Sequence, residues 1–230
     1  MNGTRCRNAL LAWAVVFAAF LIAWFAVGID RLNEIELPLA RAFNSVVGKN
    51  EALDRALIFF NHKPGEATCV LVIFAAYVAF ARACGVRAWK DIAVFGALIF
   101  VVWVVCNETS DLLEKTVTRD APAILLRQAH EHHDLAKMYG VDIKTSSTHA
   151  FPSNHGTVFF TVFFMCFFRW GRRALWLLPL VLVLDTPRVF GGAHWLSDGL
   201  VGSPLIVWPV AALATFAFAK WQARRATSGA

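Results

Sequence analysis

Two short polar segments of the 230-residue chain lie at the edges of long apolar runs and carry residue types that handle phosphate. The first is Phe151–Gly156, with the sequence Phe-Pro-Ser-Asn-His-Gly, and the second is Pro187–Asp198. A buried polar or charged group lowers stability unless it has a partner, so such groups beside apolar runs indicate a function. We expect the functional centre to lie where these two segments meet.

The first segment has the composition of an anion-binding helix start. Pro152 and Ser153 are residue types that are common at the first positions of helices. The free backbone N–H groups of such a start, together with the helix dipole, attract a phosphoryl group. His155 adds a side chain that gives or takes a proton near neutral pH. The segment therefore predicts a phosphate cradle with a proton carrier beside it.

The second segment combines a phosphate-binding cation with a nucleophile. Arg188 offers a planar fork of donors that matches phosphate oxygens. His194 follows after five intervening residues, and it can attack phosphorus if a carboxylate holds its second ring nitrogen. Asp198 lies one helical turn beyond His194, which predicts a direct hydrogen bond between the two side chains. Gly191 and Gly192 would let the backbone pass close to a substrate.

A third polar stretch, just after an apolar run, contributes two more cations. If a helix continues through it, Lys115 and Arg119 are four residues apart and project from one face. Like charges at this spacing repel each other, so an anion between them would stabilise the pair. The stretch thus predicts phosphate binding by both cations. The open alternative is salt bridging with a neighbouring acid, namely Glu108, Asp111 or Glu114.

The longest polar connection, residues 123–150, is rich in histidine. Imidazole and carboxylate groups suit zinc, but the run Glu131–His133 lacks the helical histidine pair of a zinc protease. We therefore expect no metal here and favour contact between this loop and the head group of a substrate. The histidines are His130, His132, His133 and His149.

Apolar runs separate these polar segments. The chain is 58% hydrophobic with a mean hydropathy of +0.55, which is too apolar for an ordinary soluble domain. We predict an all-α fold, a single membrane-embedded domain over residues 1–230 with six transmembrane helices. Some runs are shorter than the roughly 20 residues of a full crossing, and we expect polar turns to complete them. The runs are Ala9–Ile29, Ala67–Ala81, Ile92–Cys106, Thr157–Phe168, Ala174–Leu184 and Leu200–Ala219.

Two amphipathic patterns between the first and second runs predict short helices on the outer side of the membrane. They are Leu37–Phe43 and Leu53–Phe60, and such patterns suit helices that lie along the lipid–water interface. Packing against the bundle and gating of a substrate are both compatible with this placement.

The distribution of charge predicts the orientation. If the six runs alternate in direction, 11 basic residues and 1 acidic residue fall on one side, against 11 basic and 15 acidic on the other. Short loops rich in Lys and Arg stay in the cytoplasm, so both termini should be cytoplasmic and the two polar segments should face outward. The net charge of +6 follows from this topology and does not indicate nucleic-acid binding.

The two polar segments resemble motifs of the type 2 phosphatidic acid phosphatase superfamily, a family of integral membrane lipid phosphatases. The second family motif, PSGH, is matched by Pro152–His155, with Asn154 in place of glycine. The third, SRxxxxxHxxxD, is matched by Pro187–Asp198, with proline in place of serine. Together with the six-span layout, the resemblance covers most of the chain.

The first family motif, KxxxxxxRP, has no direct match in the chain. The resemblance carries its phosphate-binding role over to Lys115 and Arg119, with Arg127 as a further candidate.

The resemblance implies a role for each residue of the site. His194 would be the nucleophile that forms a phosphohistidine, with Asp198 orienting it. His155 would protonate the leaving oxygen and then activate water or another acceptor. No metal or organic cofactor is implied. The phosphoryl oxygens would be held by Arg188, Ser153 and the backbone amide of Asn154.

The bacterial branch acting on undecaprenyl diphosphate gives the nearest resemblance, based on Phe151–Gly156 and Pro187–Ser203. This implies a multi-pass protein of the bacterial inner membrane whose site faces the periplasm. It would remove the terminal phosphate of undecaprenyl diphosphate and pass it to water or to lipid A. The alternatives are a phosphatase of phosphatidate, phosphatidylglycerol phosphate or lipid A, and a protein that only binds or transports a lipid phosphate.

Overall fold

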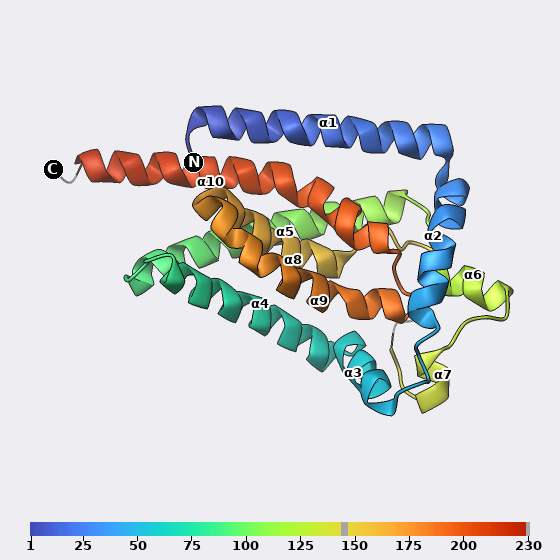
Figure 1. Ribbon diagram of the computed structural model, residues 1–230. Coiled ribbons are helices and arrows are strands. Elements are labelled where there is room, and N and C mark those ends of the chain that lie inside the picture. Colours follow the sequence, from blue (N-terminus) through green and yellow to red (C-terminus); the bar gives the residue numbers. More distant parts are fainter. Residues whose placement is uncertain (144–146, 229–230) are drawn as a thin grey trace.

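The computed structural model describes residues 1–143 and 147–228, and within these ranges the chain is helical without a β-strand (Figure 1). A 3₁₀ segment, Gly171–Leu177, precedes α9, and a π-helical turn, Asp198–Gly202, precedes α10. The α-helices are α1 (Gly3–Val27), α2 (Ile29–Asn44), α3 (Glu51–Asn61), α4 (Lys63–Ala83), α5 (Trp89–Thr116), α6 (Pro122–Gln128), α7 (Leu135–Tyr139), α8 (Asn154–Trp170), α9 (Leu178–Phe190) and α10 (Ser203–Ser228).

Helix α8 lies at the centre of the bundle. It packs against α4, α5, α9 and α10, and every residue from Gly156 to Cys166 is buried. A helix that is apolar on all sides is suited to burial by protein or lipid, and here other helices surround it. The first polar segment therefore begins the most enclosed helix of the molecule, because Ser153 is the N-cap of α8.

Four of the six predicted spans are long and apolar enough to cross a membrane. They are α1, α4, α5 and the continuous stretch Asp198–Thr227 that ends in α10. The other two are shorter, since α8 has 17 residues and α9 has 13. The predicted run Ala174–Leu184 is divided between the 3₁₀ segment and α9, because Pro179 favours a new helix start at that point.

The polar segments and the chain termini lie at opposite ends of the bundle. Figure 1 shows both termini at one end and α2, α3, α6 and α7 at the other. Both predicted amphipathic segments are helical, as α2 and α3. Helix α2 lies across the end of the bundle against α9 and α6, and α3 packs against α4 and α9.

Helix α1 lies beside α10 at the edge of the bundle (Figure 1). Its C-terminal half contacts the first polar segment through aromatic rings. The ring of Phe151 lies 5.7 Å from that of Phe20 and 5.1 Å from that of Trp24, measured between centroids. These contacts fix the backbone just before Pro152.

Helix α5 ends at Thr116, so the prediction that Lys115 and Arg119 share one helical face is wrong. Beyond the helix the chain is extended and pairs with the segment before Pro152. The N–H of Arg119 donates to the carbonyl of Thr148 at 3.1 Å, and its carbonyl accepts from the N–H of Ala150 at 2.9 Å. This pairing satisfies backbone groups that a continued helix would have used internally.

Candidate active site

The two polar segments meet at the N-terminal end of α8. The N–H of Ser153 donates to the carbonyl of Asp198 at 3.2 Å, and the hydroxyl of Ser203 donates to the carbonyl of Ser153 at 2.8 Å. Segments that are distant in sequence are thus joined through their backbones. The start of α8 and the end of the second motif are therefore held together.

His194 is oriented by a backbone carbonyl rather than directly by Asp198. Its Nδ1 lies 2.7 Å from the carbonyl oxygen of Ala150 and 3.6 Å from Oδ2 of Asp198. A carbonyl oxygen can only accept, so Nδ1 carries the proton and Nε2 carries the lone pair. That is the tautomer a nucleophilic histidine needs. The expected direct hydrogen bond to Asp198 is replaced by a longer electrostatic contact.

Asp198 is the centre of a buried ion pair. Its side chain is fully buried, and its Oδ1 accepts from Nη1 of Arg119 at 2.6 Å. Its Oδ2 accepts from the backbone N–H of Trp195 at 2.7 Å. Asp198 therefore holds the turn that carries His194 and places a negative charge behind the imidazole.

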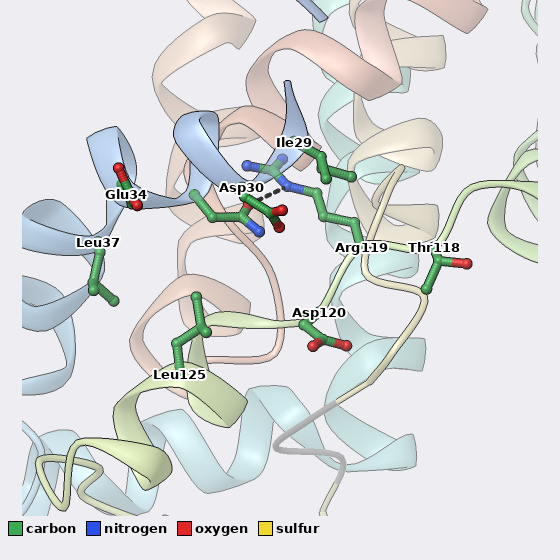
Figure 2. A pocket seen from close by; sticks show the side chains of 9 residues that line it. Ile29, Asp30, Glu34, Leu37, Thr118, Arg119, Asp120 and Leu125 are labelled. Atoms are coloured by element: carbon green, nitrogen blue, oxygen red, sulfur yellow. Dashed lines mark hydrogen bonds between the residues drawn. The ribbon is translucent and has the colours of Figure 1, made fainter. Parts of the chain in front are cut away.

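Arg119 extends from the segment after α5 to the Asp198 carboxylate, and residues of α2 bond to its guanidinium from the other side. Its Nε donates to Oδ1 of Asn33 at 2.9 Å, and its Nη2 donates to Oε1 of Glu36 at 3.1 Å. Ser197 accepts from Nη1 at 2.9 Å. Figure 2 shows the guanidinium directed toward α2. These contacts place Arg119 among carboxylates that neutralise its charge.

A pocket of about 340 Å³ opens beside Arg119 (Figure 2). Its wall combines apolar side chains with the acids Asp30, Glu34 and Asp120, while Arg119 itself is 2% exposed. Lys115 lies elsewhere, exposed at the end of α5, where it lines a separate pocket with Asp111, Glu114, Ser147 and His149. The structure therefore separates the two cations that the sequence analysis grouped together.

Arg188 has the surroundings of an anion-binding group. It is 5% exposed, and its Nη2 contacts both Glu66 and, at 3.0 Å, Nε2 of His155. Its Nε and Nη1 are buried and have no hydrogen-bond partner among the described residues. Leaving charged donors buried and unpaired is costly, so these two N–H groups are suited to a bound anion.

Glu66 belongs to this site, although neither of the two motifs includes it. Its Oε1 contacts Arg188 and lies 3.5 Å from Nε2 of His155. The only signal in the sequence was an acid at the start of an apolar run, directly after Pro64 and Gly65. No pattern in the sequence connects Glu66 with the two motifs, since its contacts with them form only in the folded protein.

A pocket of about 350 Å³ extends from His155 and Glu66 between α4, α5 and α8. Near the site its wall is polar, and away from the site it becomes apolar. A pocket of this kind suits a molecule with a charged head and an apolar chain. The polar members are Lys63, Glu66, Asn107, Asn154 and His155, and the apolar members are Ala67, Val70, Trp103, Val158 and Phe159.

Ser153 and Asn154 hold the start of α8. The hydroxyl of Ser153 accepts from the N–H of Gly156 at 3.2 Å and lies 3.5 Å from Oδ1 of Asp185. The side-chain amide of Asn154 donates to Oδ1 of Asp111 at 2.6 Å. Ser153 thus caps the helix, while its position in the sequence had predicted contact with phosphate.

Asp185 is a second acid that the sequence analysis missed, because it directly follows the apolar run that ends at Leu184. It is 5% exposed and interacts electrostatically with His194 and Arg188. Gly199 packs against it so closely that an added Cβ would lie 1.9 Å from Oδ2 of Asp185. The glycine is therefore required for this acid to fit.

The histidine-rich loop contacts the second polar segment through His132. The side chain of His132 is 2% exposed, and Nε of Arg127 donates to its Nδ1 at 3.3 Å. Burial lowers the pKa of His132, and the nearby charge of Arg127 lowers it further. An added Cβ on Gly192, whose φ is +75°, would lie 3.3 Å from Nε2 of His132. The loop thus packs directly over the turn that leads to His194.

Arg127 also pairs with Asp134 at 2.8 Å, so it stabilises this loop. Within residues 1–143 and 147–228, no group of three or more His, Cys, Asp or Glu side chains is arranged to hold a metal ion.

Comparison with known proteins finds a distant relative. The chain is 22% identical over 196 residues to the lipid A 1-diphosphate synthase of Escherichia coli (strain K12), and the match covers 84% of this chain and 81% of that protein. No family model matches the chain. No solved structure matches it either.

Proposed function

We propose that the protein is an integral membrane lipid phosphatase or phosphotransferase that acts on the terminal phosphate of undecaprenyl diphosphate. The observation that carries this proposal is the pair of buried, unpartnered donors on Arg188, next to His155 and close to the turn of His194. The distant similarity to a lipid A 1-diphosphate synthase supports a lipid diphosphate as substrate or product.

In the first half-reaction, Nε2 of His194 attacks the terminal phosphorus. The N–P bond forms as the bond from phosphorus to the bridging oxygen breaks, and His155 gives its proton to that oxygen. Arg188 and the N–H groups at the start of α8 stabilise the charge on the transferring oxygens. The products are lipid monophosphate and phosphohistidine.

In the second half-reaction, His155 takes a proton from the acceptor, which attacks phosphorus and releases His194. With water as acceptor the product is inorganic phosphate. With a phosphate group of lipid A as acceptor, the product is a lipid diphosphate. The same residues serve both outcomes, so the choice depends on which acceptor reaches the site.

The proposal includes six membrane crossings, with α8 and α9 as the two short ones. It places both termini in the cytoplasm and the site at the periplasmic face of a bacterial inner membrane. The opposite placement of termini and site along the bundle supports this topology, as does the basic charge around the termini.

Phosphate release and trapping of the phosphoenzyme test the proposal. The purified protein in detergent should release phosphate from undecaprenyl diphosphate, and His194→Ala should lower turnover by about 1,000-fold or more. His155→Ala should slow formation of an acid-labile phosphoenzyme. His62→Ala, which alters an exposed histidine before α4, serves as the control. Normal turnover by His194→Ala would rule out the nucleophile.

The choice of substrate is tested with a panel of lipid phosphates, each with and without lipid A. Much faster hydrolysis of phosphatidate, phosphatidylglycerol phosphate or lipid A would contradict undecaprenyl diphosphate as the substrate. Tight binding of the lipid diphosphate without any phosphoenzyme would indicate a binding or transport protein.

A further inference from the structure

The Glu66 carboxylate lies where a cation and a proton carrier meet. Its Oε1 contacts Nη2 of Arg188 and lies 3.5 Å from Nε2 of His155, while these two nitrogens are 3.0 Å apart. Glu66 comes from the first turn of α4, His155 from α8 and Arg188 from α9. Three helices that are separate in sequence thus direct charged or titratable groups to one point.

The chemistry of these groups makes the carboxylate necessary when His155 is protonated. A guanidinium can only donate, so Nη2 of Arg188 can face Nε2 of His155 only while that nitrogen is an acceptor. Once Nε2 carries a proton, two donors oppose each other and two positive charges are in contact. The Glu66 oxygen is then the acceptor within reach of the imidazolium.

We propose that Glu66 is a positioning residue that allows His155 to hold the proton given to the leaving oxygen. This inference rests on the proposed phosphotransfer reaction and adds to it a residue outside the family motifs. As the bond from phosphorus to the leaving oxygen breaks, the proton passes from His155 to that oxygen. Glu66 stays ionised throughout and fixes the guanidinium of Arg188.

The other charges around His155 are consistent with this role. The positive charge of Arg188 opposes protonation of His155, whereas the carboxylate of Glu66 favours it. Lys63 of α4 lines the same pocket, and Asp111 and Glu114 of α5 bond to the neighbouring Asn154. Glu66 is therefore the acid in direct contact with His155.

The junction of α3 and α4 holds Glu66 in place. A Cβ on Gly65 would lie 1.8 Å from the carbonyl oxygen of Phe59, so the two backbones are in direct contact there. Pro64, at the start of α4, restricts the preceding backbone. The Glu66 side chain is one-third exposed, but its backbone is thus closely confined.

Histidine NMR tests the inference without depending on turnover. In protein labelled with ¹⁵N-histidine, Glu66→Gln should make His155 lose its proton at a pH about one unit lower or more. The spectrum of His155→Ala identifies the signal. Glu108→Gln, which alters an exposed acid on α5, should leave the titration unchanged. An unchanged His155 titration in Glu66→Gln would overturn the inference.

Leaving-group dependence gives the second readout. Glu66→Gln should lower turnover of the lipid diphosphate about tenfold or more, but should affect an aryl phosphate with a nitrophenolate leaving group much less, because that group needs no proton. Glu66→Asp should restore part of the activity. Equal losses on both substrates would show a merely structural role, and faster turnover would show that Glu66 competes with phosphate for Arg188.

The two readouts separate this inference from the proposed function. A shifted His155 titration in a protein that turns over neither substrate would confirm the role of Glu66 and contradict the phosphotransfer reaction. An unchanged His155 titration in Glu66→Gln, together with normal turnover by the wild type, would contradict the role of Glu66 and support the phosphotransfer reaction.

Discussion

At the scale of single residues, charge compensation decides which cation can bind phosphate. Arg119 and Asp198 form a pair whose side chains are 1% and 0% exposed, and Glu36 and Asn33 occupy further donors of the guanidinium. Arg188 keeps two buried donors without a partner. We therefore propose Arg188 as the phosphate clamp, while Arg119 supports Asp198.

Arg119→Ala should destabilise the protein by about 3–5 kcal/mol, because it leaves the buried Asp198 carboxylate unpaired. Thermal unfolding in detergent measures the effect. Arg31→Ala breaks an exposed pair with Glu34, and its effect should stay below about 1 kcal/mol. If Arg119→Ala keeps its stability and loses only affinity for substrate, Arg119 binds phosphate directly, as the sequence analysis predicted.

The residues that the sequence could reveal are those whose spacing reflects chemistry. His155, Arg188, His194 and Asp198 lie in two short motifs, and the structure brings those motifs together. Glu66 could not be found this way. Its contacts with His155 and Arg188 span large sequence separations, which no local pattern encodes.

At the scale of elements, tertiary pairing overrides local helical preference. The helix predicted beyond Thr116 ends because residues 119–121 bond to the segment at 147–150. That competition depends on a chain segment about 30 residues away, so the local sequence could not show it. The amphipathic patterns of α2 and α3, by contrast, are local, and they predicted helices at the right places.

The loop between α6 and α7 should make the stability of the protein depend on pH. Because the pKa of His132 is lowered in the folded protein, the unfolded chain takes up a proton first as the pH falls below about 6.5. The contribution of His132 to the free energy of unfolding should therefore be fully present above this pH and decline below it. The limiting slope is about 1.4 kcal/mol per pH unit.

Thermal unfolding between about pH 5 and pH 8 measures this dependence. His132→Asn keeps an acceptor for Arg127 and removes the titration, so its stability should vary less with pH. His133→Asn, at an exposed neighbour, should behave like the wild type. Equal pH dependence in His132→Asn and wild type would contradict the assignment.

At the scale of the whole molecule, the asymmetry of charge predicts which end of the bundle faces outward. Asp142 is exposed shortly after α7, the helix at the same end of the bundle as the polar segments, and Ala88 is exposed in the turn between α4 and α5. In a background with Cys84 replaced by serine, Asp142→Cys should react with an impermeant thiol reagent in intact bacteria. Ala88→Cys should react only after permeabilisation, and the reverse pattern would invert the topology.

The all-helical architecture was predictable because apolar runs of this length have few other stable forms in a membrane. The lengths of the central helices were less predictable. Helices α8 and α9 are surrounded by protein or broken by proline, so their ends are set by packing and capping rather than by the extent of the apolar run. The sequence showed which stretches were apolar, but not which helix would lie at the centre.

In the proposed reaction, the aromatic contact between α1 and Phe151 gives the N-terminal helix a part in the chemistry. Phe20 and Trp24 hold Phe151, and the preceding residue, Ala150, supplies the carbonyl that fixes the tautomer of His194. A helix at the edge of the bundle therefore helps to determine which ring nitrogen of His194 carries the proton and which carries the lone pair. Exchanging this helix for an unrelated membrane anchor would preserve attachment to the lipid and still alter the reactivity of the imidazole.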